Sequence, residues 1–241
     1  MTDGGGEMPC LIPPTTAQRA IWVAHQLDPG RATYNVAKYT RMDGPLDVAI
    51  FEQAVSRVQV DVQALHLRVS SREAEIELRT EADEDWRLDV VDLAAEANPE
   101  RAAFEAMERA RRKPFDMEYR PLFEWRLYKL SSQSWIWFQN YHHLIIDGWG
   151  MNLINRRVAA LYTALLRGEA AHCEPIPRLA PHLDEVAYRS SSDWANDREH
   201  WRQSLQGVPK PSTLSGRPMA PFSDFNVCLL YTSPSPRDQR G

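Results

Sequence analysis

The feature that most constrains the fold is a pair of aromatic-rich segments followed by an abrupt change in hydrophobic period. Residues 122–130 and 135–142 have the composition of β-strands, and four polar residues at 131–134 separate them in the manner of a hairpin. After Asp147 and Gly148 the apolar residues recur at helical spacing as far as residue 165, and Gly168 is placed to end that helix. The sequence therefore predicts a strand–strand–helix unit in which a short loop joins the second strand to the helix.

Strand and helix patterns also alternate through the rest of the chain. The patterns predict strands at 34–42, 65–69, 75–78 and 88–91, and helices at 17–27, 48–58, 99–112, 183–189 and 193–205. The segments at 65–69 and 75–78 alternate in hydrophobicity, as expected of a half-exposed antiparallel pair. This mixed order favours the layers of an α+β or α/β fold over a helical bundle or a β-sandwich.

Charge and targeting signals narrow the setting of the protein. The chain carries 28 Lys and Arg against 33 Asp and Glu, a formal net charge of −5, so we expect no nucleic-acid partner. No window approaches 18 consecutive apolar residues, and the first ten residues lack a secretory signal, so no membrane association is expected. Three scattered cysteines, Cys10, Cys173 and Cys228, fit a reducing compartment. Together these features predict a cytoplasmic location.

One local exception to the acidic charge is a basic cluster at the end of the helix predicted at 99–112. It consists of Arg109, Arg111, Arg112 and Lys113. Cations are favourable in the last turn of a helix, where they face the negative end of the dipole. We favour that interpretation, and a docking patch for an acidic partner is the alternative.

The strongest chemical signal lies at the end of the strand predicted at 135–142. Adjacent strand residues point to opposite faces, so His142 and His143 cannot share one cavity, and we favour His143 as reactive and His142 as structural. A neutral imidazole can accept a proton near neutral pH or hold an amine by a hydrogen bond. Asp147 can cap the following helix, and Gly148 would permit a close approach of the chain or an unusual backbone angle. A metal site is not expected, because no third ligand follows at the usual spacing.

Several segments together resemble a known family. Residues 142–148 match the motif HHxxxDG of the chloramphenicol-acetyltransferase-like superfamily, and residues 15–22 resemble a first core motif of the type S/T-x-A-Q-x-x-x-W. Residues 62–68 resemble a second motif, and residues 188–191 and 197–201 are similar to the end of an N-terminal lobe. The chain is thereby identified as similar to condensation domains of nonribosomal peptide synthetases. The resemblance is greatest to the condensation domains of enterobactin-synthetase-type serine modules, which suggests siderophore biosynthesis.

The resemblance implies a reaction and roles for the motif residues. The chain would form one of two chloramphenicol-acetyltransferase-like lobes, with an α+β (α/β sandwich) fold in which helices flank a mixed sheet. The two lobes would form a V, and amide bonds would form in the tunnel between them. His143 would be the catalytic residue, as a base or as a positioning group, supported by His142, Asp147 and Gly148. Asp147 would hold the motif loop through an ion pair with an arginine. No cofactor or metal would be bound directly, since 4'-phosphopantetheine on carrier proteins would deliver the substrates.

The resemblance also implies a domain organisation and partners. We expect a disordered N-terminus at 1–12, the N-terminal lobe of a condensation domain at 13–222, and a non-native or disordered tail at 223–241. The C-terminal lobe would be missing, so this fragment would be inactive. The donor would arrive on an upstream carrier protein in trans, and acceptor carrier and adenylation domains would follow in the parent protein.

Two other functions are compatible with the same residues. An epimerisation domain or an ester-forming acyltransferase would carry the same motif. A non-catalytic module that docks carrier proteins would need the fold but not the chemistry of His143.

Overall fold

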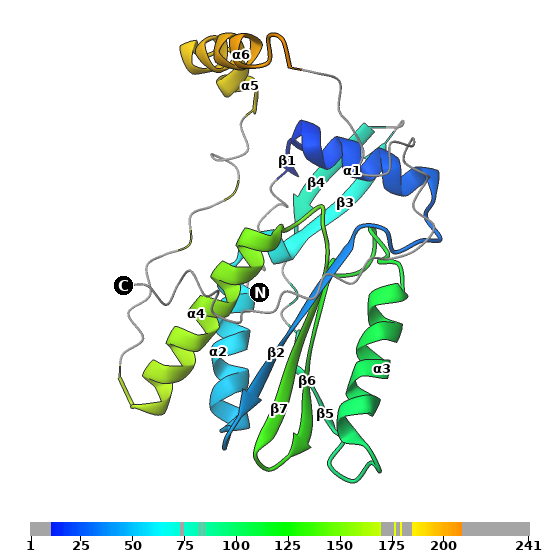
Figure 1. Cartoon of the computed structure of the whole chain (residues 1–241), viewed down its shortest axis with the longest axis vertical. Helices are drawn as coiled ribbons and strands as arrows, with labels where there is room; N and C mark the ends of the chain where they lie inside the picture. Colours follow the sequence, from blue (N-terminus) through cyan, green and yellow to red (C-terminus); the bar gives the residue numbers. More distant parts are fainter. Residues whose placement is uncertain are drawn as a thin grey trace, which may run out of the picture. The chain divides into compact units, whose positions relative to one another are not determined.

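The computed structural model describes residues 11–72, 75–81, 83, 85–169, 176, 179 and 185–208. Residue contacts divide the chain into two units, Met1–Trp194 and Ala195–Gly241. The first unit holds the sheets and the helices that cover them (Figure 1). Helix α6 (Ser192–Ser204) crosses the division between the units.

The main sheet has four strands in the order β2-β7-β6-β5. Strand β7 (Ser134–His142) is central and antiparallel to both β2 (Asn35–Asp43) and β6 (Phe123–Ser131). Strand β5 (Asp89–Asp92) pairs with β6 in parallel, because helix α3 (Pro99–Arg112) makes the crossover between them. The sheet is therefore mixed, and its central strand β7 leads directly into the motif loop.

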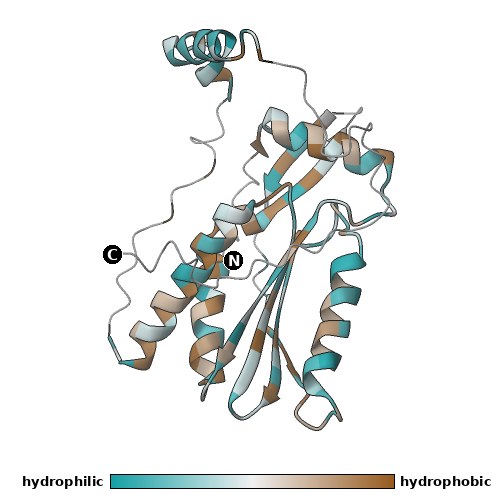
Figure 2. Ribbon diagram, viewed as in Figure 1, coloured by the Kyte–Doolittle hydropathy of each residue, from teal (hydrophilic) through white to brown (hydrophobic). Residues whose placement is uncertain are grey.

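Helices cover both faces of this sheet (Figure 1). Helices α2 (Val48–Asp61) and α4 (Gly148–Leu166) lie on one face, where Phe51, Val55 and Ile154 join Trp125 and Trp137 in the larger core. Helix α3 lies on the other face and packs Ala103 and Met107 against the sheet. Figure 2 shows the apolar residues gathered where these helices meet the strands. The period-two alternation of β7 thus supplies both cores, as expected for a sheet buried on its two sides.

A second sheet of three strands has the order β1-β4-β3. Strands β3 (Leu67–Arg72) and β4 (Glu75–Thr80) form an antiparallel hairpin, and a short 3₁₀-helix, η1 (Gln63–His66), precedes them. Strand β1 (Leu11–Ile12) pairs with β4 and buries Ile12, which is 1% exposed. Helix α1 (Thr16–Leu27) follows directly and leads to β2.

The predicted fold class is confirmed, as are the helices and strands of the described residues to within a few positions. One boundary is wrong: Leu11 and Ile12 were expected in a disordered terminus, but burial of Ile12 against β4 orders them. The other ten residues of that terminus, the predicted tail at 223–241, and Cys10, Cys173 and Cys228 lie outside the described residues. The described part of the chain has no helix both long and apolar enough to cross a membrane.

Candidate active site

The two motif histidines occupy opposite environments at the end of β7. His142 is the last residue of the strand and is 1% exposed, whereas His143 begins the turn that follows and is exposed. The backbone N–H of His143 donates a hydrogen bond of 2.7 Å to the carbonyl oxygen of Tyr34, just before β2. The backbone of His143 is thus fixed by the sheet while its imidazole faces solvent.

The turn after His143 is held by three further hydrogen bonds. The N–H of Leu144 donates to Nδ1 of His142 at 3.2 Å, and the N–H of Ile145 donates to the His142 carbonyl at 3.1 Å. From helix α1, Nε2 of Gln18 donates to the Leu144 carbonyl at 3.1 Å. Since the partners come from β7 and α1, the position of His143 depends on two separate elements.

His142 is packed in a ring of aromatic side chains. The ring of His25, on α1, meets it edge to face with 5.2 Å between centroids, and Tyr34 and Phe115 approach at 6.1 and 6.4 Å. Burial, together with the smaller effects of the nearby His25 and His143, lowers the pKa of His142 to about 3. His142 is therefore neutral at physiological pH and does not exchange protons there.

The hydrogen bond to Leu144 also fixes the tautomer of His142. Because Nδ1 accepts from the Leu144 N–H, the single proton of the neutral ring resides on Nε2. Among the described residues Nε2 has no hydrogen-bond partner. The buried ring therefore supports the turn from within by accepting the hydrogen bond of Leu144. Of the two imidazoles, only that of His143 is exposed at the surface.

Asp147 caps the helix that follows the turn. Its Oδ1 accepts a hydrogen bond of 2.8 Å from the N–H of Gly150, so that the carboxylate faces the positive end of α4. Within the described ranges no arginine lies at ion-pair distance from Asp147. The arginine partner implied by the family resemblance therefore stays a prediction.

The two glycines at the start of α4 differ in their surroundings. A Cβ at Gly148 would meet no described atom within 4 Å, and its φ is not in the left-handed region, contrary to the expectation of close approach or an unusual backbone angle. A Cβ at Gly150 would lie 2.7 Å from Cγ1 of Ile146. The steric requirement for glycine thus falls on Gly150, because the loop folds Ile146 back against the first turn of the helix.

A buried polar chain ties α4 to the sheet. The hydroxyl of Tyr141 donates to Oε1 of Gln139 at 2.7 Å, and Nε2 of Gln139 donates to Oδ1 of Asn155 at 2.6 Å. Asn155 in turn donates to Thr40 on β2 at 3.1 Å. These bonds fix the rotation of α4 on the sheet, and with it the direction in which its first turn meets the motif.

Sequence reasoning missed the role of Gln18. Its Oε1 accepts from the N–H of Thr15 at 2.9 Å, while the Thr15 hydroxyl accepts from the N–H of Gln18 at 3.2 Å, which is a capping box. The spacing of Thr15 and Gln18 carries that signal in the sequence. The further bond to Leu144 could not be foreseen, because it joins residues 126 positions apart.

The described residues contain no group of three or more His, Cys, Asp or Glu side chains able to hold a metal ion. The arrangement instead offers one exposed imidazole, a capped helix start and an exposed Trp149 beside it. Such a site suits proton transfer or hydrogen bonding to a bound substrate.

The fold and the motif define a condensation domain. The model of the condensation-domain family matches residues 11–224, so the chain belongs to that family. The isonitrile lipopeptide synthase of Streptomyces coeruleorubidus is 36% identical over 226 residues, which are 93% of this chain and 15% of that protein. Enterobactin synthase component F of Escherichia coli O157:H7 is 28% identical over 212 residues, 87% of this chain and 16% of that protein.

Solved structures of condensation domains have the same fold as this chain. The starter condensation domain of rhizomide synthetase superposes with a TM-score of 0.76 at 32% identity and covers 85% of this chain. A variant of that domain in complex with C8-CoA gives a TM-score of 0.78 at 32% identity, over 86% of this chain. This chain spans 50% and 48% of those two solved chains, respectively, and a much smaller share of the curated relatives.

Proposed function

We propose that the chain forms the N-terminal lobe of a condensation domain that joins an acyl donor thioester to the amine of an aminoacyl acceptor. The observation that carries the proposal is the imidazole of His143, exposed at the end of a buried strand and held by the backbone of Tyr34. A rigid strand end of this kind can present a reactive group reproducibly.

Amide formation requires the protein to position the two substrates and to help remove one proton from the attacking nitrogen. The acceptor nitrogen attacks the thioester carbonyl, the new C–N bond forms, the C–S bond breaks, and the nitrogen loses a proton as the thiol leaves. His143 would either accept that proton or hold the amine by a hydrogen bond while the proton leaves to solvent or sulfur. His142 cannot take the proton, because burial keeps the pKa of its imidazole at about 3.

The substrates would be tethered to 4'-phosphopantetheine. Family membership supports carrier proteins as partners. We further propose that the donor carrier acts in trans and that the acceptor carrier and adenylation domains belong to the parent protein. Both carriers would act in the cytoplasm. The chain itself would bind no cofactor, and the second lobe would supply the other wall of the tunnel, so we expect the 241 residues alone to be inactive.

A second candidate concerns the donor. The similar rhizomide synthetase domain is a starter domain, and one variant of it was solved in complex with C8-CoA. This favours a fatty acyl group carried by coenzyme A as an alternative donor, with the same attack by the acceptor amine. Supplying the full-length parent protein with acyl-CoA or with an acyl carrier protein, each with a loaded acceptor carrier, separates the two.

The test is amide formation by the full-length parent protein, followed by mass spectrometry of the acceptor carrier. We expect His143→Ala to abolish most of the activity and His200→Ala, a change at another exposed histidine, to preserve it. A module that only docks carriers would bind them equally well with either substitution and would form no amide even as the wild type.

A further inference from the structure

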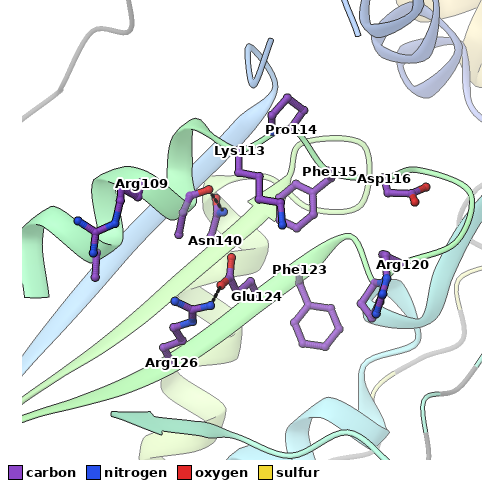
Figure 3. Close-up of a pocket in the computed structure, with 13 residues that line it drawn as sticks. Arg109, Lys113, Pro114, Phe115, Asp116, Arg120, Phe123, Glu124, Arg126 and Asn140 are labelled. Carbon is purple, nitrogen blue, oxygen red and sulfur yellow. Dashed lines mark hydrogen bonds and ion pairs between the residues drawn. The ribbon is translucent and has the colours of Figure 1, made fainter. Parts of the chain in front are cut away.

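A cavity of about 660 Å³ lies beside the motif, on the α3 side of the main sheet (Figure 3). Its walls come from the C-terminal half of α3, the segment between α3 and β6, and the first residues of β6. Phe115 lines it, and the same ring packs against His142 at 6.4 Å. We call it the α3 cavity.

Cations dominate the α3 cavity, although the chain as a whole is acidic. Arg109, Lys113 and Arg120 line it, and in the part of the chain that the structure describes none of the three has a carboxylate within 4.0 Å. The basic cluster at the end of α3 therefore divides. Arg111 and Arg112 both form ion pairs with Glu108, at 2.8 and 2.6 Å, whereas Arg109 and Lys113 line the cavity.

The two acidic side chains of the α3 cavity are already engaged. Glu124 forms an ion pair of 2.6 Å with Arg126, drawn as a dashed line in Figure 3. Asp116 accepts hydrogen bonds of 3.1 Å from the backbone N–H groups of Glu118 and Tyr119. Three lining cations thus have no carboxylate partner among the described residues, and a bound anion would gain charge-assisted hydrogen bonds from those within its reach.

A buried polar atom also points to a ligand. Asn140 lines the α3 cavity, is 1% exposed, and donates from Nδ2 to the Ala110 carbonyl at 3.3 Å. That carbonyl can only accept, so the amide nitrogen must face it and Oδ1 is left over. Within the described residues Oδ1 has no partner, and an unpaired buried acceptor is costly. A ligand with an N–H or O–H group would complete it.

We propose that the α3 cavity binds an organic phosphate. Lys113 and Arg120 would hold the phosphate, and Arg109, which Figure 3 shows at the opposite end of the cavity from Arg120, would add positive charge there. Asn140 Oδ1 would accept from an amide or hydroxyl of the same molecule, and Phe115 would contact its apolar part. The ligand must therefore carry an anionic group, a hydrogen-bond donor and an apolar part in one molecule. This proposal concerns binding alone and does not depend on amide formation at His143.

The experiment is calorimetric titration of the full chain with three probes: 4'-phosphopantetheine, pantetheine, and inorganic phosphate. The first has a phosphate on an amide-containing chain, and each of the others has one of the two parts. We expect 4'-phosphopantetheine to bind about tenfold or more tightly than either of the others, with an affinity that falls as salt is added. Binding should also shift the side-chain NH₂ signals of Asn140 in NMR spectra.

Substitutions locate the site. The double variant Arg109→Ala/Lys113→Ala and the single variant Arg120→Ala should each weaken 4'-phosphopantetheine several-fold to tenfold, and all three positions lie outside the buried core, so folding should stay intact. Arg101→Ala, on the same helix but away from the cavity and 75% exposed, is the matched control and should change affinity less than about twofold. The proposal is overturned if 4'-phosphopantetheine shows no saturable binding, if pantetheine binds as tightly, or if Arg101→Ala weakens binding as much as the cavity variants.

Discussion

The side-chain amide of Gln18, on the first helix, donates a hydrogen bond of 3.1 Å to the backbone carbonyl of Leu144, the residue after His143. The same side chain closes the capping box of α1 through the N–H of Thr15. One glutamine therefore joins the start of α1 to the turn that presents the imidazole. The first core motif and the HHxxxDG motif are, in this chain, two parts of a single local structure.

This relationship predicts different outcomes for two substitutions at residue 18. Gln18→Glu keeps the acceptor for Thr15 but loses the donor to Leu144, whereas Gln18→Ala loses both. We expect Gln18→Ala to lower the free energy of unfolding by about 1–2 kcal/mol and Gln18→Glu to lower it less. In the parent protein, both should lower the rate of amide formation, by up to about 100-fold if the turn shifts by an ångström. Thermal melts together with rate measurements test this, and unchanged rates in both variants would contradict it.

The buried His142 predicts a fall in stability with acid. Its pKa is about 3 in the folded chain against 6.5 for an ordinary histidine, so the unfolded chain binds the extra proton more readily. The contribution of neutral His142 to the free energy of unfolding is therefore fully present above pH 6.5. It is lost as the pH falls from 6.5 toward 3, by at most about 1.4 kcal/mol per pH unit. Burial lowers the pKa of His25 as well, which adds a slope of the same sign.

The measurement for this prediction is urea unfolding of the full chain between about pH 4 and pH 8, a range that spans most of this titration. His142→Asn, whose Oδ1 can replace Nδ1 as the acceptor for Leu144, should reduce the slope of stability against pH. In the parent protein, the same substitution should leave the dependence of amide formation on pH unchanged, even where it changes the overall rate. An NMR titration in which the His142 ring becomes protonated near pH 6.5 would contradict the assignment.

Asp147 is expected to have two roles, as the cap of α4 and as the partner of an arginine in the second lobe. In the full chain, Asp147→Asn should keep the cap on Gly150 and most of the stability, whereas Asp147→Ala should cost about 0.5–2 kcal/mol. In a parent protein with both lobes, by contrast, Asp147→Asn should be destabilising, because it would break the ion pair with an arginine of the second lobe. Equal stability of the asparagine variant and the wild type in both proteins would reduce Asp147 to a helix cap.

The two glycines give a steric prediction that is independent of catalysis. Gly150→Ala should destabilise the full chain by about 1–3 kcal/mol, because the new methyl group would meet Ile146 at 2.7 Å. Gly148→Ala should leave stability unchanged or raise it slightly, since its Cβ meets no described atom within 4 Å. Thermal denaturation of both variants decides the point, and the reverse order of stabilities would show that the loop is packed differently.

The sequence was sufficient for the elements and for the motif, but not for what surrounds it. Hydrophobic period and capping residues depend on neighbours a few positions away, which is why the strand at 134–142 and the helix after Asp147 were predicted closely. The contact of His25 with His142, and that of Gln18 with Leu144, depend on how α1 lies against the end of β7. The need for glycine at Gly150 rather than Gly148 likewise depends on the path of the loop, which no local pattern records.

The most direct test of the central claim is a single-turnover measurement of amide formation by the full-length parent protein, with both carriers loaded and mixed rapidly. His143→Ala should lower the rate constant by about 100-fold to 10,000-fold while the melting temperature stays close to that of the wild type, because the side chain is exposed. His200→Ala should retain the wild-type rate. If the folded His143→Ala variant keeps a rate within about threefold of the wild type, His143 neither accepts the proton nor positions the amine, and the assignment of this site is wrong.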